Sequence, residues 1–345
     1  MGKTKNRDGG VSRRGFLKAM GVGGAGMLLP AAAARAGEPR VPRPSDGELA
    51  TLLDLSKCIG CGACVEACRE SNAHKFPEPE KPFPDLVPSS RAKNEDWSDK
   101  RDVDDRLTPY NWLYIQNAEV EYEGESYDIN IPRRCMHCQN PPCANMCPFG
   151  AAGKQTNGIT RIHDDICMGG AKCRTVCPWN IPQRQSGVGL YKDLMPRFAG
   201  NGVMYKCDRC YQKLEKGELP ACIEVCPENV QTIGPRHEIV AEAKRLAKEM
   251  NGFIYGLEEN GGTNTLYVSP VPFDEINKVI DKHPLNKPVG KGLGPGKPHM
   301  GPVKDVMADE TNLATATLLA PVAGIAAGIL GLGARLADKE DDDES

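Results

Sequence analysis

Two segments of the chain alternate apolar and polar residues in the manner of β-strands. From 112 to 131 the alternation continues on both sides of Glu123-Gly124-Glu125-Ser126, a turn-forming sequence. This pattern predicts a β-hairpin. A second, shorter extended segment is predicted at 158–162, just ahead of a stretch that contains several cysteines.

One later segment carries apolar residues at helical spacing. The pattern extends from Glu238 to Met250 and is followed by Asn251-Gly252, a sequence that commonly ends helices. It predicts a helix at 238–250. The apolar stripe of this helix indicates packing against a core rather than a cofactor site.

The first 36 residues resemble an export signal and are excluded from the predicted fold. A basic stretch leads to Arg13-Arg14, a weakly apolar run follows, and Ala34-Arg35-Ala36 has the form of a cleavage site. In this order the features resemble a twin-arginine signal peptide at 1–36, with a basic disordered tail as the alternative. The resemblance implies a pathway that moves folded proteins, so the chain would fold before export.

A long uncharged run lies near the C-terminus. As an α-helix, the 22 residues of 313–334 would span roughly 33 Å, so we predict a transmembrane helix at 313–335. The Ala and Gly content and Pro321 leave a buried or interfacial helix as the alternative. The cations that follow favour a cytoplasmic C-terminus, while the acidic tail at 336–345 contributes little to orientation. The body would then lie at the periplasmic face of the inner membrane.

The composition indicates a core that is ordered by more than apolar packing. Aromatic residues make up only 6% of the 345 residues, whereas there are 15 cysteines. The net charge of -3 gives no field suited to binding nucleic acid. The sequence shows no Ser-His-Asp set, phosphate loop or paired-carboxylate site. We therefore expect no nucleic-acid partner and no substrate chemistry by this chain alone.

All 15 cysteines fall in four runs, and three of the runs end in Cys-Pro. The run at 58–68 has the C-x2-C-x2-C-x3-C spacing of bacterial ferredoxins, in which a tight loop directs several thiolates at one cluster. In two-cluster ferredoxins the fourth cysteine of a run ligates the other cluster, so the runs are expected to work in pairs. The other three runs lie at 135–147, 167–177 and 207–226.

Disulfides and structural zinc are the alternatives for so many cysteines. An odd number leaves one cysteine unpaired, and three or four close thiols per run differ from the paired knuckles of zinc sites. We therefore favour iron-sulfur clusters with all fifteen cysteines as iron ligands. His137 and His163 lie beside the runs, and we interpret them as spacers or hydrogen-bonding neighbours because the cysteines supply nearly all the required ligands.

The order of these segments indicates how the chain is organised. We place the body at 37–283 and a Pro-, Gly- and Lys-rich tether at 284–312, ahead of the membrane helix. Between the first two runs, 71–107 is rich in Pro and charged residues and predicts a surface excursion that is loosely ordered or faces a partner. The fold class is predicted to be α+β, with tandem bacterial-ferredoxin-like modules, long loops and the C-terminal transmembrane helix.

Several motifs beyond the cysteine spacing carry a family resemblance. They are Leu107-Thr108-Pro109-Tyr110, Cys135-Met136-His137-Cys138, Pro220-Ala221-Cys222-Ile223-Glu224-Val225-Cys226-Pro227 and the Ile233-Gly234 approach to the predicted helix. With the twin-arginine start and the C-terminal anchor, they cover nearly the whole chain. The sequence resembles the polyferredoxin subunits of hydrogenase-2-type periplasmic [NiFe] hydrogenases, within the larger group of four-cluster subunits of membrane oxidoreductases.

This resemblance implies that the first run pairs with the fourth and the second with the third. It implies three [4Fe-4S] clusters, held by Cys58, Cys61, Cys64 and Cys226, by Cys68, Cys207, Cys210 and Cys222, and by Cys135, Cys138, Cys143 and Cys177. At the fourth site only Cys147, Cys167 and Cys173 remain, because Gly170 stands where the family pattern has a cysteine. Three thiolates suit a [3Fe-4S] cluster, with a fourth [4Fe-4S] cluster as the alternative.

The resemblance also implies a function. The chain would be a non-catalytic subunit that takes electrons from the small and large subunits of a hydrogenase. It would pass them to an integral membrane subunit that reduces quinone. The alternatives are the same relay in a formate, nitrite, sulfur-compound or multihaem cytochrome complex, and, from another class, a membrane-bound redox sensor. Four clusters in one chain favour the relay.

Overall fold

The computed structural model describes residues 47–86, 94–194, 202–282 and 296–319, together with Arg197, Pro321 and Ile325. The predicted signal peptide and acidic tail lie outside these residues, as do parts of the predicted tether and membrane helix. Residues 310–319 are helical. Within the described residues, no helix combines the length and the apolar character needed to cross a membrane.

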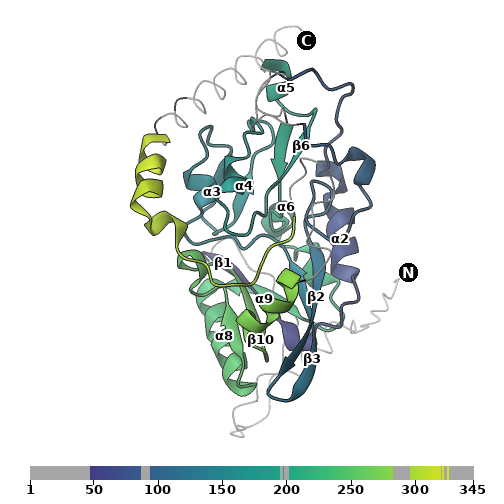
Figure 1. The fold of residues 1–345 in the computed structure, drawn as a ribbon, viewed down its shortest axis with the longest axis vertical. Coiled ribbons are helices and arrows are strands. Elements are labelled where there is room, and N and C mark those ends of the chain that lie inside the picture. The colour runs from purple at the N-terminus through teal and green to yellow at the C-terminus, as the bar shows by residue number, and fades with distance from the viewer. Residues whose placement is uncertain are drawn as a thin grey trace, which may run out of the picture. The chain divides into compact units, whose positions relative to one another are not determined.

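A four-stranded sheet forms the base of the body (Figure 1). Its strands, in spatial order, are β8 (Gln231–Pro235), β1 (Leu49–Asp54), β10 (Thr265–Ser269) and β9 (Phe253–Tyr255). Strand β1 runs parallel to β10 and antiparallel to β8, with Leu52 opposite both Leu266 and Thr232. Strand β9 pairs antiparallel with β10. Thus β1, which precedes the first cysteine run, pairs with β8, which follows the last.

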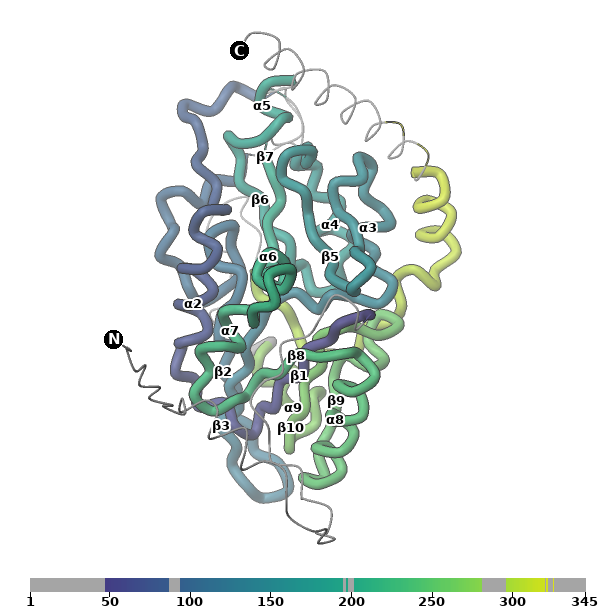
Figure 2. The backbone as a smooth tube through the Cα atoms, turned by 180° about the vertical axis from the view of Figure 1, so that it is seen from behind, coloured from purple at the N-terminus to yellow at the C-terminus, as the bar shows by residue number. Residues whose placement is uncertain are grey.

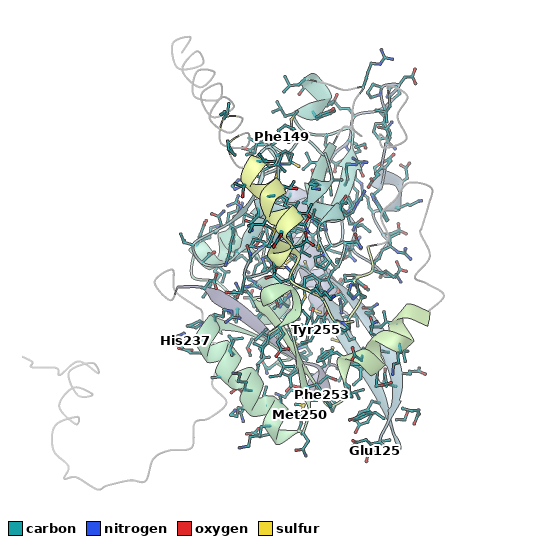
Figure 3. All side chains as sticks on the ribbon, turned by 60° about the vertical axis from the view of Figure 1, so that its left-hand side comes forward. Glu125, Phe149, His237, Met250, Phe253 and Tyr255 are labelled. Atoms are coloured by element: carbon teal, nitrogen blue, oxygen red, sulfur yellow. The ribbon has the colours of Figure 1, made fainter. Side chains whose placement is uncertain are left out.

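Helix α8 (Arg236–Glu249) covers one face of this sheet (Figure 1). Its buried residues Ile239, Ala243 and Ala247 form one core cluster with Leu52 of β1 and Leu266 of β10. His237 and Met250 mark the two ends of the helix (Figure 3). The predicted helix at 238–250 is therefore confirmed, and its apolar stripe packs against the sheet.

A long hairpin lies against the other face of the sheet. It consists of β2 (Tyr114–Tyr122) and β3 (Glu125–Arg133), with Ala118 opposite Ile129. Glu123 and Gly124 both have positive φ, which is the geometry of a type I′ turn. Helix α9 (Phe273–Lys282) packs across β2 and shares a core with Leu53 and Tyr267 of the sheet. The hairpin predicted within 112–131 is confirmed.

The cysteine runs lie in and beside short helices. Helix α2 (Ala63–Asn72) lies beside α7 (Ala221–Glu224), and α3 (Pro142–Asn145) lies beside α4 (Lys172–Thr175), as Figure 2 shows. The first pair brings together runs one and four, and the second pair brings together runs two and three. The remaining α-helices and strands are α5 (Tyr191–Leu194), α6 (Tyr211–Glu215), β4 (Ala152–Lys154), β5 (Thr160–Ile162), β6 (Gln183–Ser186) and β7 (Gly202–Tyr205).

Two short antiparallel ribbons flank these helices. Strand β4 pairs with β5, and β6 pairs with β7. The extended segment predicted at 158–162 is confirmed in β5, which leads into the third run. Short 3-10 helices complete the described elements, at Leu55–Lys57, Ala73–Lys75, Ser98–Lys100, Glu259–Gly261 and Val306–Ala308.

Part of the predicted tether packs into the body. Met300 and Met307 are 0% and 4% exposed. The hydroxyl of Tyr255 accepts a hydrogen bond from Trp179 Nε1 at 2.9 Å and donates one to the carbonyl of Gly301 at 2.8 Å. Figure 3 labels Tyr255 together with Phe253 on β9. Residues 296–308 therefore pack against the core. The Pro and Gly content from which the tether was predicted gave no indication of these contacts.

The surface excursion predicted at 71–107 is wrong around Glu95 and Trp97, although residues further along, such as Asp99 and Asp102, are exposed. Glu95 and Trp97 are 2% and 0% exposed. The Glu95 carboxylate accepts two hydrogen bonds from Arg174 of α4, both at 2.7 Å, and one from Arg184 of β6 at 2.8 Å. A charged composition predicted solvent exposure, but here one buried carboxylate is paired with two guanidinium groups inside the protein.

Replacing Glu95 with alanine is expected to lower the free energy of unfolding by about 3–5 kcal/mol, because two largely buried guanidinium groups lose their counter-charge. Anaerobic denaturant titration would measure the change. Glu78→Ala is the matched control, since Glu78 also pairs with an arginine, Arg101, but in an exposed position. It should cost less than about 1 kcal/mol. Equal effects would contradict the role of burial.

Candidate iron-sulfur cluster sites

Site 1 is a hollow lined by four cysteines from two runs that are far apart in the sequence, Cys58, Cys61, Cys64 and Cys226. Cys58 and Cys61 lie in the loop ahead of α2, Cys64 lies in its first turn, and Cys226 follows α7. The backbone N–H of Val230 donates to Cys226 Sγ at 3.4 Å. Cys61 is exposed, so this site reaches the surface.

Site 2 is formed by Cys68, Cys207, Cys210 and Cys222. The thiol of Cys68 lies close enough to the other three for electrostatic interaction with each. The Nδ2 atom of Asn72 reaches Cys68 Sγ at 3.8 Å and Cys210 Sγ at 3.9 Å. The backbone N–H of Arg209 donates to Cys207 Sγ at 3.3 Å.

Site 3 is a second hollow, lined by Cys135, Cys138, Cys143 and Cys177. Its wall includes His137, whose Nδ1 accepts a hydrogen bond from the Thr160 backbone N–H at 3.1 Å. Burial, followed by the charges of Arg209, Lys206 and Arg134, holds the pKa of His137 well below its ordinary value. His137 is thus a neutral hydrogen-bonding neighbour of this site.

Site 4 contains only three cysteines, Cys147, Cys167 and Cys173, which interact electrostatically with one another. The backbone N–H of Met204 donates to Cys167 Sγ at 3.5 Å. Gly170 lies between Cys167 and Cys173 and is exposed, with no heavy atom within 4 Å of the position that a Cβ would take. A side chain at position 170 would therefore begin in open space at the surface.

The conformation of the loop that carries Gly170 is restricted by the preceding residue, Gly169. Gly169 has φ +61°, and a Cβ there would overlap the carbonyl oxygen of Gly202 in β7. Arg184 Nη1 donates to the Gly169 carbonyl at 2.9 Å. Gly169 is consequently required by a left-handed conformation and a close backbone contact, whereas neither restriction applies to Gly170.

The four sites form a row in the order 1, 2, 3, 4. Electrostatic interactions join Cys64 of site 1 to Cys222 of site 2 and Cys207 of site 2 to Cys135 of site 3. Sites 3 and 4 are joined through Cys173 and Cys143. Each site therefore lies next to the following one inside the protein, and sites 1 and 4 are the ends of the row.

Burial changes the acidity of the thiols. It raises the pKa of Cys64 and Cys143 to about 12 and that of Cys177 to about 11. In the metal-free chain these thiols would be protonated at neutral pH. Because iron binds thiolates, binding at these positions must release protons, and burial makes this coupling strong.

A single metal ion does not match the arrangement of these cysteines. Among the described residues, no three His, Cys, Asp or Glu side chains are placed to hold one ion. Thiolates around one zinc ion stand roughly 3.8 Å apart, as follows from Zn–S bonds of about 2.3 Å. Four cysteines at each of sites 1, 2 and 3 fit a larger group, because a cuboidal cluster with four corner irons has the matching donor set.

Three buried cations near the sites were missed by the sequence interpretation. Arg134, Lys206 and Arg209 are 3%, 6% and 3% exposed. Each lies next to or within two residues of a cysteine, in Arg134-Cys135 and in Lys206-Cys207-Asp208-Arg209-Cys210. That adjacency was visible, but exposed lysine and arginine are so common that it did not indicate burial.

Comparisons with known proteins agree with this geometry. Residues 57–151 match a 4Fe-4S dicluster domain, and residues 127–236 match a second family with the same description. Together the matched residues include all four cysteine runs. The fold and the sites therefore define an iron-sulfur protein of the ferredoxin class, with tandem dicluster domains of mixed helices and strands.

Individual relatives indicate to which group of iron-sulfur proteins the chain belongs. The hydrogenase-2 operon protein HybA of Escherichia coli O157:H7 is 32% identical over 308 residues, which cover 77% of this chain and 83% of that protein. The iron-sulfur subunit of the nitrate-inducible formate dehydrogenase of Escherichia coli K12 is 29% identical, with coverage of 89% and 92%. A sulfite dehydrogenase subunit of Allochromatium vinosum is 27% identical, with coverage of 60% and 76%. The chain belongs to the polyferredoxin subunits of membrane oxidoreductases, which relay electrons.

Proposed function

We propose that this chain relays electrons between the catalytic subunits of a periplasmic [NiFe] hydrogenase and a membrane subunit that reduces quinone. The row of four cysteine sites is the observation that carries this proposal. The row has an exposed cysteine at one end and an exposed glycine at the other, so each end is accessible to a partner. Similarity to the hydrogenase-2 operon protein supports the choice of donor.

The proposed ligands follow the four groups in the fold. Site 1, site 2 and site 3 would each hold a [4Fe-4S] cluster on four cysteines, and site 4 a [3Fe-4S] cluster on Cys147, Cys167 and Cys173. The clusters supply reversible one-electron chemistry when bound. The chain supplies the thiolates and the N–H donors that Val230, Arg209 and Met204 direct at sulfur.

A second donor also has specific support. The formate dehydrogenase subunit aligns with 89% of this chain, against 77% for the hydrogenase-2 protein, although its identity is lower. The same relay could therefore serve formate oxidation. In both cases the partners would be catalytic subunits on one side and a quinone-interacting membrane subunit on the other.

We further propose that the chain is exported by the twin-arginine pathway and held at the periplasmic face of the inner membrane by a helix at 313–335. The described start of that segment supports the anchor, since Leu313 and Leu318 are 55% and 75% exposed. Ile325, further along, is 65% exposed. Apolar side chains at such exposure suit a lipid environment.

Purification of the native complex from membranes under anaerobic conditions tests these proposals. We expect about 15 irons for each copy of this chain, with little zinc, after the irons of the partner subunits have been subtracted. Co-purification of a hydrogenase pair would support the first donor, and a formate dehydrogenase would select the second. Near-stoichiometric zinc with little iron would refute the cluster relay.

A further inference from the structure

Arg134 is a buried cation whose only hydrogen-bond acceptor in the described structure is a cysteine sulfur. Its Nη1 donates to Cys222 Sγ at 2.9 Å. Its Nε and Nη2 atoms are buried without a hydrogen-bond partner among the described residues. Such groups are uncommon, because a buried guanidinium is normally satisfied by carboxylates or carbonyl oxygens.

The groups around Arg134 show where its counter-charge must come from. Within the described residues it forms no ion pair with a carboxylate, and the groups that attract it are, in order, Cys222, Cys207, Tyr267 and Cys64. Two of these cysteines belong to site 2 and one to site 1. The positive charge therefore faces sulfur atoms at the boundary between sites 1 and 2.

The other two buried cations are held differently. Lys206 Nζ donates to the carbonyls of Thr160 and Cys207, and Arg209 donates to the carbonyls of Leu49 and Asn264. Both are thus held largely by carbonyl oxygens, although Lys206 also hydrogen-bonds to Cys135 of site 3 and Nε of Arg209 has no partner among the described residues. Asp208, the acid beside site 2, is paired with Lys75 at 2.6 Å and does not neutralise Arg134.

We propose that Arg134 raises the reduction potential of the cluster at site 2, an inference that rests on the cluster assigned to that site above. Reduction adds one electron and makes the cluster more negative, and no proton is taken up because arginine is already protonated. A fixed positive charge that donates to a ligand sulfur stabilises the reduced form, and the buried surroundings screen this attraction weakly. Site 1 receives a smaller effect through Cys64.

Arg134→Met tests the inference, because methionine keeps much of the volume and removes the charge. Redox titration followed by electron paramagnetic resonance should show one four-iron cluster whose reduction equilibrium constant has fallen at least tenfold, a shift of about 59 mV for one electron. Arg134→Lys, which keeps the charge, should shift less. The difference should persist at high ionic strength, because a buried charge is poorly screened by salt.

Arg133→Met is the matched control. Arg133 is the adjacent residue and is also buried, but it donates to the carbonyl of His299 and lies over the Tyr267 ring, and within the described residues it has no hydrogen bond to a cysteine. Its substitution should leave every midpoint potential unchanged. An Arg134→Met protein with full iron content and unaltered potentials would refute the inference, as would an equal shift in Arg133→Met.

If Arg134→Met loses iron, a second pair of variants still tests the inference. Arg134→Gln retains a hydrogen-bond donor without the charge, so its site 2 potential should lie below that of Arg134→Lys. Equal potentials in these two variants, or loss of the site 2 cluster from both of them, would refute a role in setting the potential. Absence of iron at site 2 in the unaltered protein would instead refute the cluster assignment, so the two failures are distinguishable.

Discussion

Substitution of Gly170 by cysteine is expected to raise the iron content from about 15 to about 16 per chain by completing site 4 with a fourth thiolate. The three-iron paramagnetic signal of the oxidised protein should largely disappear, and a four-iron signal should appear on reduction. The structure permits this change, because Gly170 is exposed and its Cβ position is free of contacts. Mössbauer and electron paramagnetic resonance spectra of anaerobic samples would measure it.

Two controls separate the thiolate from the side chain itself. Gly170→Ala adds a Cβ without a ligand and should leave the three-iron signal intact. Gly169→Ala should disturb the whole loop, since its Cβ would overlap the carbonyl of Gly202. Four intact [4Fe-4S] clusters in freshly prepared unaltered protein, before any exposure to air, would contradict the three-iron assignment.

Replacement of Cys138 by serine is expected to remove about four irons and to interrupt the relay at site 3. Site 3 lies between sites 2 and 4, so its loss leaves a gap inside the row and not at an end. In the native complex, electron delivery to quinone should fall to background. Reduction of an artificial dye directly at the catalytic partner should persist, because that reaction does not require the row.

The matched control for Cys138 is Met136, a neighbour that is also buried and lines the same hollow without being a proposed ligand. Met136→Leu should retain iron and quinone reduction. Full quinone reduction by a Cys138→Ser complex that lacks the site 3 irons would show that electrons take a route outside the proposed row.

Local patterns were sufficient to predict the elements whose partners lie close in sequence. The hairpin of β2 and β3 is closed by Glu123-Gly124, and the stripe of α8 is visible within 14 residues. Strand β1 was missed because all its residues are buried and its sequence shows no alternation, and its partners, β8 and β10, lie far along the chain. Periodicity contains no information about such pairing.

The candidate sites, too, could be predicted from the sequence only where the pattern is local. Cysteine spacing identified the four runs, but the meeting of Cys58 with Cys226 in site 1 came from family resemblance, since no local pattern relates them. The buried acid Glu95 and the buried cation Arg134 were missed for a common reason. Sequence shows the charge of a side chain, whereas its burial depends on partners that only the fold brings together.

The pairing of the first cysteine run with the last has a consequence for biogenesis. Site 1 and site 2 each need cysteines from both ends of the body, and β1 has no antiparallel neighbour until β8 exists. Roughly 160 residues separate Cys64 from Cys222, which a ribosome adds in roughly 8 to 30 s at 5–20 residues per second. Sites 3 and 4, which use only the two inner runs, become complete earlier. Under the proposed ligand sets, the inner sites of the emerging polypeptide can therefore receive iron before the outer ones. Strand β1 remains without its antiparallel partner until β8, which follows the last run, has been translated.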